Sequence, residues 1–252
     1  MSPPLSILDY HQPVEFRIGE VIVRSWNILS RHFVTFILLV GIAELLPLAI
    51  DLYLPIEDSA GAGMWLTVYG SKFVGFVLGT VAQAMVVHAA FQDLRGRPVN
   101  AGESLRLGLR RVLPVIVASV LTGVVVAVGL ILCIVPGLIA LTAMAVVIPA
   151  CVVEDLGPID SLSRSSDLTT GHRWPILAVG AAWLVISLIV GLSIGAAFGF
   201  FSGANGVPMK ILEWVWSVLS TSFTSVYAAI LYHDLRAVRE GIGIDEIASV
   251  FD

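Results

Sequence analysis

Long apolar stretches alternate along the chain with shorter stretches that carry polar residues on one side. A membrane-spanning helix needs about 20 mostly apolar residues to cross a hydrocarbon core of about 30 Å. Stretches of roughly this length recur six times, at residues 33–54, 73–91, 112–133, 138–153, 175–201 and 211–232. The pattern therefore predicts an all-α integral membrane protein with six transmembrane helices.

Three shorter stretches, residues 16–31, 100–111 and 157–170, have the period of an amphipathic helix. In the first of them the polar residues follow one another at helical spacing: Arg17, Glu20, Arg24, Asn27 and Arg31. In the second, Leu105 and Leu109 lie opposite the charged residues. Helices of this kind lie in the membrane interface, with their arginines among the lipid headgroups.

The segments between these elements also carry signals. Residues 64–91 form an apolar stretch too long for one span, so residues 64–72 are expected outside the membrane or along its surface. Pro136 and Gly137 predict a tight turn between the third and fourth spans. Residues 1–15 are expected to form an N-terminal tail, and residues 55–63 and 202–208 are expected to form loops. The C-terminal tail is expected to contain a short helix after Gly243.

Glycines four residues apart occur in two of the spans. The second span contains Gly75 and Gly79, and the fifth contains Gly191, Gly195 and Gly199. This spacing lets helix backbones approach closely inside a membrane, so it predicts helix contacts at both places.

A short motif, x-Asp-Leu-x, closes three of the apolar stretches. Its copies begin at Gln92, Glu154 and His233. Each copy follows the second of two spans, so the chain is predicted to consist of three related units, each an interfacial helix followed by a helical hairpin. The units are approximately residues 16–98, 99–157 and 158–240, with short tails at both ends.

The composition supports the membrane assignment. Of the 252 residues, 57% are hydrophobic and only 13% are charged, whereas soluble domains carry about 25% charged residues. The N-terminus lacks the basic region and apolar core of a secretory signal. The two cysteines, Cys133 and Cys151, are too few and too far apart for a disulfide framework.

The distribution of basic residues predicts the orientation. Every arginine lies in a tail, in an interfacial helix or at an Asp-Leu motif, and the opposite side has only Lys72 and Lys210. Because basic residues concentrate on the cytoplasmic side, both termini and the three interfacial helices are predicted to be cytoplasmic. The arginines suited to anionic lipid headgroups or to an acidic partner are Arg24, Arg106, Arg110, Arg164 and Arg173.

Acidic residues supply the remaining site predictions. Glu44 lies well inside the first span with no basic residue at similar depth, so it either serves a polar cavity or is a hydrogen-bonded structural acid. Asp51 lies nearer the outer surface, within possible reach of Lys72 or Lys210. The three motif carboxylates, Asp93, Asp155 and Asp234, are expected to form structural ion pairs at the cytoplasmic rim. The expected partners are Arg24, Arg106 or Arg110 for Asp93, and Arg164 for Asp234.

Motifs for catalysis are missing from the sequence. There is no zinc-protease motif, no nucleophile elbow, no phosphate-binding loop and no Cys-x-x-Cys pair. No metal or other cofactor is predicted, and the basic residues are too few for nucleic-acid binding. The sequence therefore predicts a protein that is not an enzyme.

Two segments support a resemblance. One begins at Val153-Glu154-Asp155-Leu156-Gly157-Pro158 and continues through residues 162–174, and the other spans residues 231–236 with Arg239-Glu240-Gly241. They resemble a bacterial family of six-span membrane domains related to the membrane domain of glycerophosphodiester phosphodiesterases. The phosphodiesterase domain has no counterpart in this sequence, so the resemblance implies the fold and a place in a bacterial inner membrane, but not the hydrolase.

The leading functional hypothesis is a membrane scaffold or accessory subunit. It would dock a membrane protein complex or anionic lipid at the cytoplasmic arginines. The alternative is a carrier or channel for a small or amphipathic substrate that uses Glu44, and a weaker alternative is an intramembrane lipid-modifying enzyme.

Overall fold

The computed structural model describes residues 18–53, 62–201 and 207–240, with side chains left out at 62–68 and 197–201. The described residues form helices joined by short turns and contain no strand. In chain order the helices are α1 Ile18–Arg31, α2 Phe33–Tyr53, α3 Ala62–Leu94, α4 Ala101–Arg110, α5 Val112–Leu132, α6 Ile134–Ala143, α7 Val147–Val153, α8 Pro158–Thr169, α9 Arg173–Phe201 and α10 Val207–Glu240. The predicted N-terminal tail, the helix after Gly243 and most of both loops lie outside the described residues.

The predicted fold class is confirmed, because six helical segments are long and apolar enough to span a membrane. They are α2, most of α3, α5, α6 together with α7, most of α9, and α10. The order of a short helix followed by two spans recurs three times, starting at α1, α4 and α8.

The second span of each group lies inside the bundle and the first lies outside. Of the most apolar part of α3, α6–α7 and α10, 50%, 44% and 44% is buried, compared with 22%, 11% and 6% for α2, α5 and α9. The inner helices α3, α7 and α10 contact one another, whereas α9 contacts mainly α10 and α6. The outer helices therefore present most of their surface to lipid.

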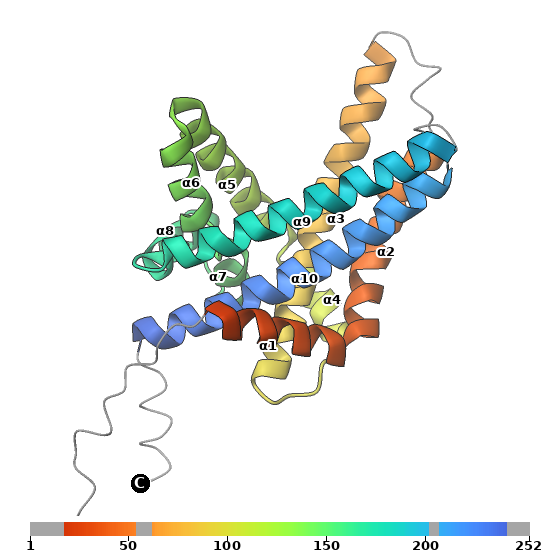
Figure 1. Ribbon diagram of the computed structural model, residues 1–252. Coiled ribbons are helices and arrows are strands. Elements are labelled where there is room, and N and C mark those ends of the chain that lie inside the picture. Colours follow the sequence, from red (N-terminus) through yellow and green to blue (C-terminus); the bar gives the residue numbers. More distant parts are fainter. Residues whose placement is uncertain (1–17, 54–61, 202–206, 241–252) are drawn as a thin grey trace, which may run out of the picture.

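The packed core lies at one end of the bundle, beside α1, α4 and α8. Most of its residues come from residues 81–91 of α3, from α7 and from residues 226–235 of α10, with smaller contributions from α1, α2, α5, α8 and α9. Figure 1 shows the α5–α6 hairpin leaning away from α3 and α10 beyond this region. The bundle is thus closed at the end that carries the short helices, called here the arginine-rich end, and splayed at the opposite end.

Small residues seat the short helices on the bundle. Ser25 in α1, Ser104 in α4 and Ser161 in α8 are fully buried, and a Cβ added to Gly108 would meet the Met85 side chain of α3. Small side chains let the helices approach closely. Leu105 and Leu109 are exposed, as expected for residues that face lipid.

The turn between the third and fourth spans differs from the sequence prediction. It lies at Cys133, and Pro136 and Gly137 belong to the first turn of α6. Proline is tolerated there because the first-turn N–H groups have no partner within the helix. Gly137 packs against Gly129 and Leu130 of α5, where a Cβ would overlap the Leu130 side chain and backbone.

The second and fifth spans bear on two other predictions. Helix α3 runs without a break from Ala62 to Leu94, so the predicted second span, residues 73–91, lies within one longer helix. Among the described residues, no neighbouring helix lies close to where a Cβ of Gly79, Gly191 or Gly195 would be, so these glycines form no helix contact there. Gly199 lies outside the residues whose side chains are described. Gly75 alone of the second-span pair faces another helix, at Pro47 of α2.

The fourth span is broken in its middle, which the sequence did not predict. The chain forms turns at residues 144–146, between α6 and α7. Ser165 of α8 reaches this break, where its hydroxyl donates to the Ala143 carbonyl at 2.7 Å and accepts from the Val146 N–H at 3.2 Å. One serine thus satisfies two backbone groups that the helix break would otherwise leave unpaired in an apolar environment.

Candidate functional site

The Asp-Leu motifs form a polar network at the arginine-rich end. Asp93 binds His32 at 2.8 Å and Arg31 at 3.6 Å, and Asp155 pairs with Arg111. The basic partners lie at the junction between the short helix and the outer span of the same group. Each of these two aspartates therefore links the end of its hairpin to the beginning of that hairpin.

The residue before each aspartate contacts the next short helix. The Gln92 side-chain amide donates to Glu103 of α4 at 2.9 Å, and Glu154 accepts from the Nε of Arg164 in α8 at 2.9 Å. Hydrogen bonding to Glu154 raises the pKa of Arg164 above its usual value, so this guanidinium stays charged. The motif thus connects consecutive groups of helices.

The third motif connects the last described helix, α10, to the first short helix, α1. Asp234 binds Arg24 of α1 at 2.8 Å and its neighbour His233 at 3.1 Å. The expected partner, Arg164, instead binds Glu154 and Glu240, because α8 lies beside the second motif. Likewise Asp93 binds Arg31 and His32 instead of Arg24, Arg106 or Arg110, because the end of α1 lies next to the end of α3.

The inner helices meet at the centre of this network. The Phe91 and Tyr232 rings contact edge to face, with centroids 5.6 Å apart, and the Tyr232 hydroxyl donates to Glu154. Tyr232 is fully buried. The arginine-rich end is therefore sealed by contacts among α3, α7 and α10.

Farther from this end, Glu44 lies between two cavities. Its carboxylate accepts a hydrogen bond from Thr221 of α10 at 3.3 Å, and its backbone carbonyl accepts one from the Trp214 indole at 3.2 Å. No ion pair involving Glu44 occurs in the described part of the chain.

The first cavity has a volume of about 410 Å³ and lies between the inner helices and α5. About half of its lining is polar: Glu44, Thr80, Gln83, Ser119, Thr122, Thr221 and Thr224. Met144 and Val147, at the break in the fourth span, also line it. The Thr122 hydroxyl, beside this cavity, is buried without a hydrogen-bond partner among the described residues.

The second cavity, of about 520 Å³, shares Glu44, Gly75 and Phe76 with the first and extends toward the opposite end. Its charged lining residues are Asp51, Lys72, Lys210 and Glu213. The Lys210 ammonium donates to the Asp51 backbone carbonyl at 2.5 Å. The lining residues of these two cavities, which meet at Glu44, Gly75 and Phe76, are together called here the Glu44 path.

Most residues of this path were not singled out from the sequence. A usable signal was present in the sixth span, where Ser217, Ser220, Thr221, Thr224 and Ser225 are unusually dense for a lipid-facing helix. Thr80 and Gln83 of α3 and Thr122 of α5 gave weaker signals, because single hydroxyl or amide groups are common in apolar helices.

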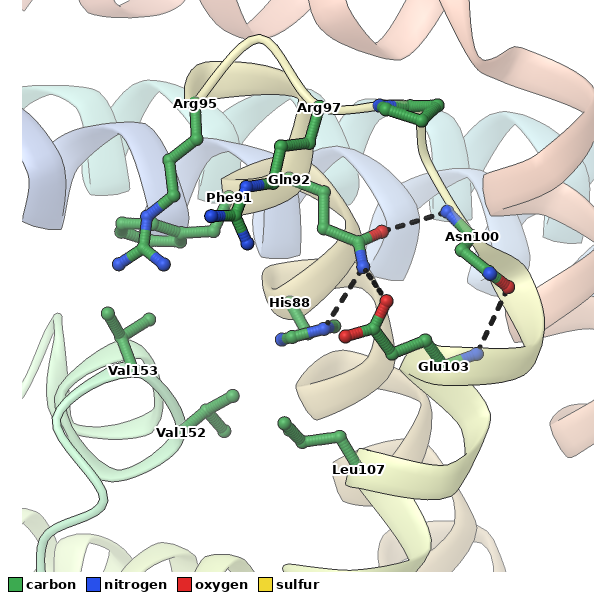
Figure 2. Close-up of a pocket in the computed structure, with 11 residues that line it drawn as sticks. His88, Phe91, Gln92, Arg95, Arg97, Asn100, Glu103, Leu107, Val152 and Val153 are labelled. Atoms are coloured by element: carbon green, nitrogen blue, oxygen red, sulfur yellow. Dashed lines mark hydrogen bonds between the residues drawn. The ribbon is translucent and has the colours of Figure 1, made fainter.

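A third, smaller cavity of about 310 Å³ lies at the arginine-rich end, among α3, α4 and α7 (Figure 2). Arg95 and Arg97 extend into it from the turn after α3, and neither forms an ion pair with a described residue. Of the arginines predicted for lipid or partner contact, Arg106 and Arg110 are exposed on α4, whereas Arg173 is partly buried. Arg24 and Arg164 are engaged by acids.

Among the described residues, no group of three or more His, Cys, Asp or Glu side chains is placed to hold a metal ion. The titratable lining of the first cavity is limited to Glu44.

Six apolar spans, three outer ones packed around three inner ones and joined at one end by a charged network, define a polytopic α-helical membrane protein. The chain belongs to the family described as a domain of unknown function (DUF7847), which matches residues 65–235, more than half of its length. Comparisons with curated proteins and with solved structures gave no match.

Proposed function

We propose that the protein is a carrier or channel for a small solute with a cationic or hydrogen-bond-donating group, which binds at Glu44. The observation that carries the proposal is the shared position of Glu44 in two polar-lined cavities that adjoin inside the bundle. An acid at membrane depth without a basic partner is costly unless it serves a polar pathway.

The broken fourth span supports the same proposal. Broken helices inside membrane proteins occur where the backbone is buried in protein or lines a cavity, and many transporters bind their substrates at such breaks. Here the break contributes Met144 and Val147 to the wall of the cavity that contains Glu44. In this proposal the packed core between Gln83 and the arginine-rich end closes the protein on that side, and the solute reaches Glu44 from the opposite end.

The proposed setting is the inner membrane of a bacterium, with both termini and the arginine-rich end in the cytoplasm. The concentration of arginine at the end that carries α1, α4 and α8 supports this orientation.

The test uses the purified full chain in proteoliposomes, with currents recorded on a supported membrane after pulses of methylammonium, choline and a polyamine. We expect at least one cation to give a current. Glu44→Gln should reduce that current by at least about tenfold, since one charged hydrogen bond is worth about 1.5–3 kcal/mol. The matched control is Asp167→Asn at an exposed position of α8, which should leave the current unchanged. Equal currents from the wild type and Glu44→Gln would contradict the proposal.

A second function, docking of an anionic lipid surface or an acidic partner as an accessory subunit, is favoured by α4. This helix exposes Arg106 and Arg110 beside the exposed Leu105 and Leu109, the combination expected of an interfacial contact. Glutamine at both arginines should then release a co-purifying partner or anionic lipid without affecting a Glu44-dependent current.

A further inference from the structure

The turn after α3 presents two arginines on the wall of a cavity. The Gly96 N–H donates to the Asp93 carbonyl and the Arg97 N–H to the Gln92 carbonyl, both at 2.9 Å. This is the hydrogen-bond pattern of a Schellman helix end, and it requires the left-handed conformation that Gly96 adopts, with φ of 66°. The turn thereby fixes the backbone positions of Arg95 and Arg97 on either side of the glycine.

Both side chains extend into the cavity of about 310 Å³ shown in Figure 2. The neighbouring polar groups are already engaged with one another. Gln92 donates to Glu103 at 2.9 Å and accepts from the Asn100 N–H at 2.8 Å, and its amide nitrogen lies 3.3 Å from His88 Nε2. The carboxylate of Glu103 is therefore held on the α4 side, beside His88.

The two guanidinium groups differ from most other arginines at this end in having no carboxylate partner in the described residues. Arg24, Arg111 and Arg164 each bind an acid. The remaining lining is apolar, from Phe91, Leu107, Val152 and Val153. Two guanidinium groups without carboxylate partners, next to an apolar cavity wall, suit a ligand that has an anionic group attached to an apolar chain.

We infer that Arg95 and Arg97 form a binding site for a phosphate group, borne by a lipid headgroup or by a free phosphate ion. Guanidinium groups bind phosphate through charge-assisted, often bidentate hydrogen bonds. The site lies where an inner helix ends among the interfacial helices, at the level expected for headgroups. It is separate from the Glu44 path and does not depend on the proposed transport.

The test measures binding by native mass spectrometry of the purified full chain in mild detergent. The probes are short-chain phosphatidic acid, short-chain phosphatidylcholine and inorganic phosphate. We expect phosphatidic acid to bind the wild type more tightly than phosphatidylcholine does. Arg95→Gln with Arg97→Gln should weaken that binding by at least about tenfold. Both residues are exposed, so the variant should keep the wild-type elution volume and melting temperature.

The control is Arg239→Gln, which removes an exposed arginine of α10 at the same end but outside the cavity and should leave the affinity unchanged. Binding of phosphatidic acid without binding of inorganic phosphate identifies a lipid headgroup as the ligand. Binding of both, each lost in the Arg95 and Arg97 variant, identifies the phosphate group alone. The inference is overturned if the wild type and the Arg95 and Arg97 variant bind alike, if Arg239→Gln loses binding instead, or if the wild type binds no anionic probe.

Discussion

At the scale of single residues, the position of each small side chain decides how closely two helices approach. Gly137 lies directly against the backbone of α5, whereas Gly123 of α5 has no neighbour close to where a Cβ would be. The glycine spacing predicted contacts at Gly75, Gly79, Gly191, Gly195 and Gly199, and of these Gly75 faces another helix whereas Gly79, Gly191 and Gly195 do not. Spacing alone cannot tell a glycine at a helix contact from one that lines a cavity or faces lipid.

Alanine at Gly137 should destabilise the protein, because the added methyl group overlaps Leu130 and overpacking costs about 1–3 kcal/mol. Alanine at Gly123 should be neutral or slightly stabilising, since nothing obstructs it. Thermal unfolding in detergent compares the two variants, and an equal melting temperature for both would contradict the packing described here.

At the scale of elements, the periodicity of polar residues located all three short helices, and hydropathy located all six spans. Hydropathy did not reveal the break between α6 and α7, because residues 144–146 are as apolar as their surroundings. The break is stabilised by Ser165, which is distant in sequence and lies in a different helix. A hydrogen-bond partner from a distant helix cannot be recognised from the local sequence pattern. By contrast, Glu44 could be recognised, because a single acid stands out within an apolar span.

Alanine at Ser165 should lower the free energy of unfolding by about 1–3 kcal/mol, because it leaves the Ala143 carbonyl and Val146 N–H unpaired. Alanine at Ser163, exposed on the same helix, serves as the control and should have little effect. The measurement is again thermal unfolding in detergent. Identical losses from both variants would show that Ser165 contributes only through the helix that carries it.

At the scale of the whole molecule, the inner and outer spans differ in composition as well as in position. The inner spans have mean hydropathies of 1.7, 2.3 and 1.3, compared with 2.4, 2.8 and 2.4 for the outer spans. Helices that contact lipid on most of their surface need to be more apolar than helices that contact protein. The distinction between inner and outer spans was therefore present in the sequence. The sequence did not show how the three groups of helices are arranged around one another.

The orientation can be tested with the native cysteines. Cys133 is exposed at the turn between α5 and α6, and Cys151 is buried. An impermeant maleimide should label Cys133 from outside intact cells, because the positive-inside rule places that turn opposite the arginine-rich end. With Cys133→Ala as background, Arg106→Cys should react only after permeabilisation. Labelling of both sites in intact cells would contradict the topology.

The contact between Arg24 and Asp234 has a consequence for biosynthesis. These residues come from the first and last described helices, and α1 packs chiefly on α10. A ribosome makes α1 long before α10, so the buried side of α1, including Val21 and Ile28, lacks its native cover until the final span is inserted. Chains that terminate early would keep that surface uncovered, and cellular proteases could distinguish them from finished molecules by it.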